Sequence, residues 1–203
     1  MRLQAESPHL VLASASASRR ALLEHAGLRF SAHAAAVDEA TAKQAARASG
    51  ASAAGVALLL AEMKARRIAR GESDALVIGC DQMLVCGEQW FDKPSDQAEA
   101  RAHLCALRGR THELVTAVLC LRGGQRIWHH VARPRLTMRD FGDAFLDAYL
   151  EAEGEAVTTT VGAYRLEGLG VHLFDAVEGE YAAILGLPLL PLLGFLRQHG
   201  VLL

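Results

Sequence analysis

The sequence lacks the motifs of several common kinds of functional site. It contains no H-E-x-x-H motif and no P-loop lysine motif. Gly168-Leu169-Gly170 begins like a dinucleotide fingerprint but lacks the third glycine, which argues against an oxidoreductase. The cysteines form no C-x-x-C pair and have no zinc-ligand spacing, so they indicate small core residues of a reducing compartment. They are Cys80, Cys86, Cys105 and Cys120.

Long apolar runs and a strong net charge are also missing. The formal net charge of -2 provides no basic field for a nucleic acid polymer or a membrane surface. Phosphate chemistry would therefore need a local group of cations or a metal ion. Residues 10–13 are too short for the apolar region of a signal peptide, and residues 184–196 are too short to span a bilayer. We expect a cytoplasmic protein.

The order of the predicted elements indicates an α/β fold with a mixed sheet in two lobes. Strands alternate with helices early in the chain, and antiparallel hairpins follow in the middle. The predicted strands are residues 9–13, 28–36, 76–78, 83–86, 112–121, 125–138, 157–164, 171–174 and 181–185. The predicted helices are residues 19–26, 52–70, 96–107, 140–150 and 189–199, and residues 40–49 form a helix or a loop.

The stretch Leu76–Pro94 is the first candidate site. The predicted strand ends at Gly79-Cys80 and is followed by Asp81, then by a hairpin that closes with Lys93-Pro94. A carboxylate and a lysine that a hairpin brings together suit an anion and a metal ion. A strand cap and a surface ammonium explain the same residues, so both interpretations stay open.

The loop of small residues at 14–18 is the second candidate site. It joins a strand to a helix whose first turn carries Arg19 and Arg20. Backbone N–H groups, hydroxyls and guanidinium groups at a helix start favour an anion, although a serine cap with two solvated arginines is the alternative. Asp38 and Glu39 could likewise bind a metal ion or cap a helix. Lys64, beside Arg66 and Arg67, has the pattern of a solvated helix face.

Together these pieces resemble the Maf family of nucleoside triphosphate pyrophosphatases. They occur in order along the chain: LASASASRRALL at 12–23, VDE at 37–39, LAEMKA at 60–65, GCDQ at 79–82, KP at 93–94, GRTHELVTAV at 109–118, GAY at 162–164, EG at 178–179 and GLP at 186–188. The resemblance implies one domain over residues 1–203, related to the inosine triphosphatase fold. That fold has a long mixed sheet and two lobes around a central cleft.

The resemblance also implies an activity and a set of site residues. The activity is hydrolysis of a nucleoside triphosphate to the monophosphate and pyrophosphate with a divalent cation, Mg²⁺ or Mn²⁺. Asp81 matches the proton acceptor of the family. The other polar cleft positions correspond to Ser14, Arg19, Glu39, Lys64 and Lys93. Glu39 is the natural second carboxylate for the metal ion, and Asp81 could act as the base or as a metal ligand.

Three positions bear on which base is bound. Gln82 and Glu167 resemble the branch of the family that acts on 7-methyl-GTP, where the pyrimidine-preferring branch has threonine and glutamine. A carboxylate can accept from guanine N1–H and the exocyclic amine, and it favours the cationic methylated base. Ser18 departs from the tryptophan of that branch, and Ala17 from the usual proline.

Two other functions and one assembly remain open. The alternatives are a pyrophosphatase that prefers dTTP or UTP, and a non-catalytic nucleotide-binding regulator of cell division. A homodimer is common among members of the family, and the sequence itself indicates no interface.

Overall fold

The computed structural model describes residues 3–72 and 74–203. The chain divides into two compact units, which are described separately. Unit 1 comprises Met1–Gln82, Thr116–Ala132 and Gly186–Leu203, and unit 2 comprises Met83–Val115 and Arg133–Leu185. Strand pairs are both parallel and antiparallel, so the predicted mixed α/β fold is confirmed. None of the helices within the described residues is long and apolar enough to cross a membrane.

The strands of unit 1 begin with a buried parallel group. β1 (Leu10–Leu12) pairs in parallel with β2 (Ser31–Ala32) and with the start of β3 (Leu76–Cys86), where Leu10 lies opposite Leu76. The later part of β5 (Thr111–Arg122) pairs antiparallel with β6 (Gln125–Ala132). The apolar residues of β1 and the first apolar run of β3, residues 76–78, are buried, as expected for strands covered on both faces.

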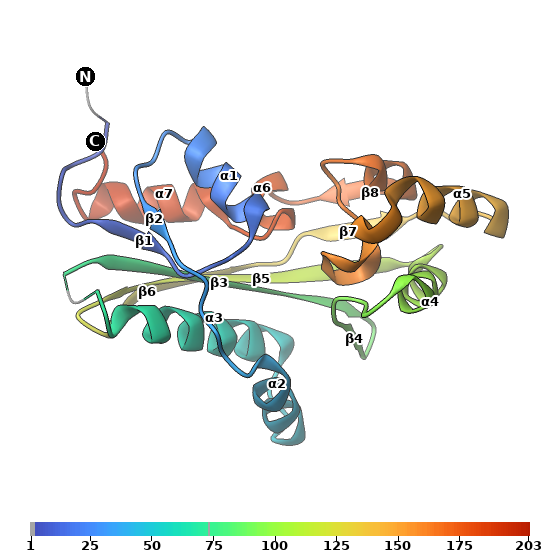
Figure 1. Ribbon diagram of the computed structural model, residues 1–203, viewed down its shortest axis with the longest axis horizontal. Coiled ribbons are helices and arrows are strands. Elements are labelled where there is room, and N and C mark those ends of the chain that lie inside the picture. Colours follow the sequence, from blue (N-terminus) through green and yellow to red (C-terminus); the bar gives the residue numbers. More distant parts are fainter. Residues whose placement is uncertain (1–2, 73) are drawn as a thin grey trace. The chain divides into compact units, whose positions relative to one another are not determined.

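Helices cover both faces of this part of the sheet (Figure 1). α1 (Ala17–His25) and α7 (Leu189–Gln198) lie on one face, and α3 (Ala53–Ala69) lies on the other. α2 (Glu39–Ala48) precedes α3 and contacts it. Because side chains alternate along a strand, Leu10, Leu12 and Ile78 share one core with α1 and α7.

The prediction that the strand ends at Gly79-Cys80 is wrong. β3 continues to Cys86, so Asp81 lies inside the strand rather than at its end. Gly79 is a site of close helix–strand packing: a Cβ atom there would collide with the carbonyl oxygen of Ala61 and lie 2.8 Å from Ala65 Cβ. The glycine therefore allows α3 to approach β3 and does not mark a turn.

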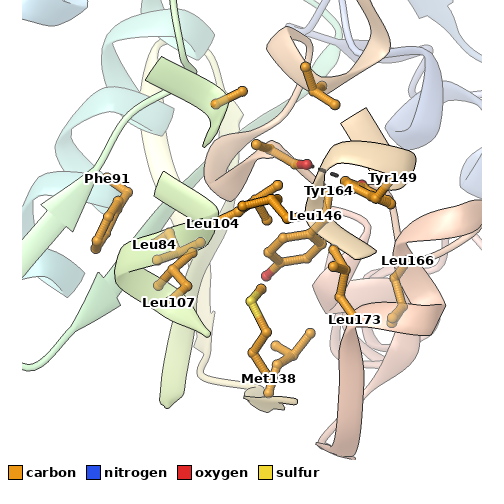
Figure 2. Close-up of a cluster of buried hydrophobic side chains, with 14 of the residues drawn as sticks. Leu84, Phe91, Leu104, Leu107, Met138, Leu146, Tyr149, Tyr164, Leu166 and Leu173 are labelled. Atoms are coloured by element: carbon orange, nitrogen blue, oxygen red, sulfur yellow. Dashed lines mark hydrogen bonds between the residues drawn. The ribbon is translucent and has the colours of Figure 1, made fainter. Parts of the chain in front are cut away.

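Unit 2 contains the predicted hairpin and a second hydrophobic core. The end of β3 pairs antiparallel with β4 (Gln89–Phe91), and the start of β5 pairs with β7 (Arg135–Met138), which pairs with β8 (Phe174–Glu178). The helices are α4 (Gln97–Leu107), α5 (Asp143–Glu153) and α6 (Tyr181–Ile184). Figure 2 shows Leu84, Leu104 and Leu107 packed beside Tyr164 in the core.

Three predicted strands of unit 2 are wholly or mainly helical instead. Residues 157–164 contribute to the 3₁₀ turns η1 (Gly154–Thr158) and η2 (Val161–Ala163), because Gly162 and Ala163 have positive φ angles. Residues 171–173 belong to a third turn, η3 (Leu169–Leu173), so β8 begins only at Phe174. The segment predicted as strand 181–185 is the short helix α6. Helix α4 is capped by Asp96, whose carboxylate accepts from the backbone N–H of Glu99.

Candidate active site

A partly buried ion cluster in unit 1 joins three residues from three elements. The Lys64 ammonium nitrogen lies 2.5 Å from Asp81 Oδ1 and 2.8 Å from Glu39 Oε1. The side chain of Asp81 is 6% exposed, that of Lys64 12% and that of Glu39 42%. The interpretation of Lys64 as a solvated surface cation is therefore wrong: its ammonium pairs with two carboxylates.

Local packing sets the geometry of this cluster. Asp81 points from β3, two residues after Gly79, while Lys64 lies between Ala61 and Ala65 on α3. The close contact of Gly79 with those alanines brings the two elements within reach of one ion pair. Glu39 is the first residue of α2. Asp38 caps that helix by accepting from the backbone N–H of Thr41. Of the two adjacent carboxylates, Asp38 therefore caps the helix and Glu39 forms the ion pair with Lys64.

The serine loop orients Arg19. Ser16 caps α1, and its hydroxyl accepts from the backbone N–H of Arg19. Ser14 Oγ accepts from the backbone N–H of Ser16 and from Arg19 Nη1, each at 3.2 Å. Arg19 Nε donates to the carbonyl oxygen of Gly186 at 2.8 Å. The helix begins at Ala17, so Arg19 lies in its first turn, and its guanidinium group is held from two sides.

Because Gly186 has no side chain, there is room beside it for the Arg19 guanidinium group. Its φ angle is +101°, a conformation that favours glycine, and a Cβ atom there would lie 3.0 Å from Arg19 Nε. The contact links residues 167 positions apart in the sequence. A side chain at position 186 would therefore strain the backbone and crowd the guanidinium group.

The electrostatics connect the serine loop to the ion cluster. Burial raises the pKa of Asp81 above its usual value, and the charges of Lys64 and then Arg19 offset part of that rise. Burial also raises the pKa of the neighbouring Cys80 thiol to about 11, so this cysteine is an inert core residue at neutral pH. Arg19, Lys64 and Asp81 thus belong to one electrostatic environment.

The remaining candidate residues divide between the two units. Gln82 follows Asp81 on β3, and its Nε2 donates to Oγ1 of the buried Thr116 at 2.8 Å. Ser18 lies on α1. Lys93, just after β4, and Glu167, between η2 and η3, are exposed residues of unit 2. Unit 1 contains the other candidates, of which Lys64 contacts Asp81 and Glu39, and Ser14 contacts Arg19. The approach of Lys93 and Glu167 to the same substrate stays a prediction.

The donor atoms of the cluster suit a hard divalent cation. Asp81 and Glu39 offer carboxylate oxygens that meet at one nitrogen, and Mg²⁺ and Mn²⁺ prefer such ligands. Residues 3–72 and 74–203 contain no group of three His, Cys, Asp or Glu side chains placed to hold a metal ion. Two protein carboxylates leave coordination positions for water and phosphate oxygens, the usual arrangement for Mg²⁺ with a nucleotide.

Three supporting residues were not singled out from the sequence. Ser16, Thr116 and Gly186 contact Arg19 or Gln82. Each lies within a stretch that carried the family resemblance, namely the serine loop, residues 109–118 and residues 186–188. Those stretches were the available signal, although nothing in them indicated the individual contacts.

Comparison with known proteins gives consistent matches over nearly the whole chain. A family model described as "Maf-like protein" matches residues 9–199. A protein of Granulibacter bethesdensis named nucleoside triphosphate pyrophosphatase is 58% identical over 193 residues, covering 95% of this chain and 98% of the relative. A protein of Rhodospirillum rubrum with the same name is 55% identical, covering 97% of each chain. A protein of Rhizobium meliloti named 7-methyl-GTP pyrophosphatase is 51% identical, covering 96% of this chain and 98% of the relative.

Proposed function

The chain belongs to the Maf family, and from this premise we propose that it hydrolyses a nucleoside triphosphate to the monophosphate and pyrophosphate. The names of its relatives support the reaction class. The observation that carries the proposal is the Lys64 ammonium between Asp81 and Glu39, in the same electrostatic environment as Arg19. A housecleaning role, the removal of modified nucleotides from the nucleotide pool, fits this chemistry.

The proposed residue roles follow from the charge that develops during the reaction. Attack of water at the α-phosphorus increases negative charge on the phosphate oxygens and on the leaving pyrophosphate, so cations that face them lower the barrier. Arg19, Lys64 and Lys93 would supply positive charge along the triphosphate. Ser14 would help to orient it, directly or by holding Arg19. Asp81 would accept the proton of the attacking water or hold the metal ion.

Asp81 and Glu39 are the residues that would hold a divalent cation, Mg²⁺ or Mn²⁺. When bound, such a cation neutralises charge on the phosphate oxygens and lowers the pKa of a bound water. The two carboxylates are preorganised for this task, because both are already turned towards one cation, the Lys64 ammonium.

We propose a preference for 7-methyl-GTP over dTTP and UTP. Relatives at 51% and 46% identity carry the name 7-methyl-GTP pyrophosphatase. Gln82, Glu167 and Ser18 are the proposed specificity residues, and Glu167 supplies the carboxylate that suits a cationic base. A comparison of kcat/KM on the three nucleotides tests this preference, and faster turnover of dTTP or UTP would overturn it.

The reaction class is tested by identifying the products. The purified chain is incubated with a panel of nucleoside triphosphates and Mg²⁺ or Mn²⁺, and pyrophosphate and orthophosphate are quantified separately. The proposal expects one pyrophosphate per nucleoside monophosphate. Nucleotide binding without pyrophosphate release would instead support the non-catalytic regulator.

A homodimer and a cytoplasmic location stay predictions that follow from the family resemblance and the sequence composition. The mass of the protein in solution tests the first, with two chains expected per particle. Fractionation of cells tests the second, with the chain expected in the soluble cytoplasmic fraction.

A further inference from the structure

The Lys64 ammonium fills the place between the two carboxylates proposed to hold the metal ion. It touches Asp81 Oδ1 at 2.5 Å and Glu39 Oε1 at 2.8 Å. A divalent cation that bridges these two oxygens needs distances of about 2.0–2.2 Å to each, so it would occupy the same volume. The ammonium and the cation cannot make these contacts at the same time.

We infer that Lys64 is an internal counter-ion of this site, which a divalent cation must displace from Asp81 and Glu39 in order to bridge them. The inference rests on the proposed function and deepens it, because it assigns Lys64 a role before nucleotide binds. While Lys64 is in place, the Asp81 carboxylate stays paired although its side chain is only 6% exposed. An unpaired buried carboxylate would carry a large desolvation cost.

The surroundings of Lys64 confine the displacement to its side chain. Ala61 and Ala65, on either side of it on α3, pack against Gly79 of β3, where a Cβ atom would have no room. The helix backbone is therefore fixed against the strand that carries Asp81. The flexible four-carbon stem of lysine can swing without moving the helix. A displaced ammonium is then available to phosphate oxygens of the substrate.

Charge balance gives the expected direction of the effect. Two carboxylates and one ammonium sum to one negative charge, whereas the carboxylates alone sum to two. Removal of the ammonium removes both a competitor and a repulsive charge close to the cation. Lys64→Gln should therefore bind Mn²⁺ at least about tenfold more tightly than the wild type.

The test is a titration of nucleotide-free, chelator-treated protein with Mn²⁺. Electron paramagnetic resonance measures the concentration of free Mn²⁺ at each step. The variants are Lys64→Gln, Lys64→Arg and Arg67→Gln. Lys64→Arg keeps a cation that competes for the two carboxylates, so its Mn²⁺ dissociation constant should stay closer to that of the wild type than to that of Lys64→Gln. Arg67→Gln removes an exposed cation from the same helix and should change it by no more than about twofold. Equal or weaker Mn²⁺ binding by Lys64→Gln than by the wild type would overturn the inference.

A second measurement uses the wild-type chain, in case Lys64→Gln does not fold. Lysine acetylation by an amine-reactive ester is followed by peptide mass spectrometry with and without saturating Mg²⁺. Displacement predicts that Lys64 reacts several-fold faster with Mg²⁺ present, while Lys93, which is already exposed, is unchanged. An unchanged Lys64 rate contradicts the inference. Because neither readout involves nucleotide turnover, failure here is separate from failure of the proposed reaction.

Discussion

Asp81 is the residue whose surroundings matter most to the proposed chemistry. It lies inside a buried strand, where burial raises the pKa of its carboxyl, and Lys64 and Arg19 act against that rise. The positive charges of Lys64 and Arg19, rather than solvent, are what favour the ionised form of this carboxyl. A group in this position can accept a proton or bind a cation without first shedding a hydration shell.

Replacing Asp81 by Asn should abolish most of the turnover. The amide keeps the size of the side chain but loses the negative charge, so it can neither accept a proton nor attract a metal ion. We expect kcat to fall by at least about 100-fold, the range for a lost acid–base group. The matched control is Asp147→Asn, which removes an exposed carboxylate that pairs with Arg101 on the surface of unit 2. A rate for Asp81→Asn close to that of the wild type would remove Asp81 from the mechanism.

His112 gives a prediction about stability and pH. This histidine of unit 2 is 1% exposed, its Nε2 lies 2.7 Å from the Tyr164 hydroxyl, and its Nδ1 has no hydrogen-bond partner among the described residues. Burial lowers its pKa from 6.5 to about 4. Between pH 6.5 and pH 4 the folded state therefore binds fewer protons than the unfolded state. The free energy of unfolding decreases as the pH falls through this range.

The expected loss from His112 between pH 6.5 and pH 4 is about 3 kcal/mol, because each pKa unit corresponds to about 1.4 kcal/mol. Urea denaturation at a series of pH values measures it. His112→Gln keeps a polar group near Tyr164 but cannot titrate, so its stability should change less over the same range. Parallel pH dependences for variant and wild type would show that His112 titrates normally.

At the scale of elements, the contact between α3 and β3 determines whether the ion cluster can form. Gly79 lies against Ala61 and Ala65, and these small residues allow the helix to approach the strand closely. Lys64 and Asp81 lie directly beside this contact. Packing and the proposed chemistry are therefore coupled at this point.

Gly79→Ala should separate the helix from the strand. The new methyl group would meet backbone as well as the Ala65 side chain, so relief requires movement of the helix. We expect a loss of about 1–3 kcal/mol in the free energy of unfolding, together with reduced kcat, measured by denaturation and by turnover.

The control for Gly79→Ala is Gly55→Ala in the first turn of α3. An added methyl group there meets only Ser52 Oγ at 3.6 Å, and alanine favours the helix. This variant should be as stable as the wild type or slightly more stable, with unchanged kcat. If both variants behave alike, the close contact at Gly79 does not determine the cluster.

The elements could be predicted where local patterns decide them, and not where distant contacts do. The early strand–helix alternation and the hairpin after Asp81 follow from apolar periodicity and turn residues. Gly79 has the pattern of a strand end, but its role depends on α3. The threonine-rich residues 157–164 have the composition of a strand. There Gly162 adopts a φ angle of +80°, and Ala163 accepts a hydrogen bond from the Tyr149 hydroxyl.

The candidate site, like the elements, could be predicted only where local sequence patterns determine it. Periodicity along α3 alone makes Lys64 a surface cation, and only the ordered set of motifs grouped it with Asp81 and Glu39. The hydrogen bond from Arg19 to the carbonyl oxygen of Gly186 could not be predicted from the sequence. The two residues are 167 positions apart, so no pattern near the arginine indicates the contact. Tertiary contacts of this kind can be recognised only once the chain is folded.

At the scale of the whole molecule, the candidate residues are shared between two units of the chain. Unit 1 contains the ion cluster, the serine loop and Gln82, while unit 2 contains Lys93 and Glu167. Of the residues proposed to act on the phosphates, all but Lys93 belong to unit 1, and Glu167 of unit 2 is proposed only for the choice of base. Changes at Glu167 should accordingly alter the choice of nucleotide more than the rate of bond cleavage.

The position of bond cleavage is the most direct test of the central claim. Hydrolysis of the preferred nucleotide is carried out in ¹⁸O-labelled water, and the products are separated and examined by mass spectrometry. Attack at the α-phosphorus predicts the label in the nucleoside monophosphate and none in the pyrophosphate. Label in pyrophosphate or in free orthophosphate would contradict the account.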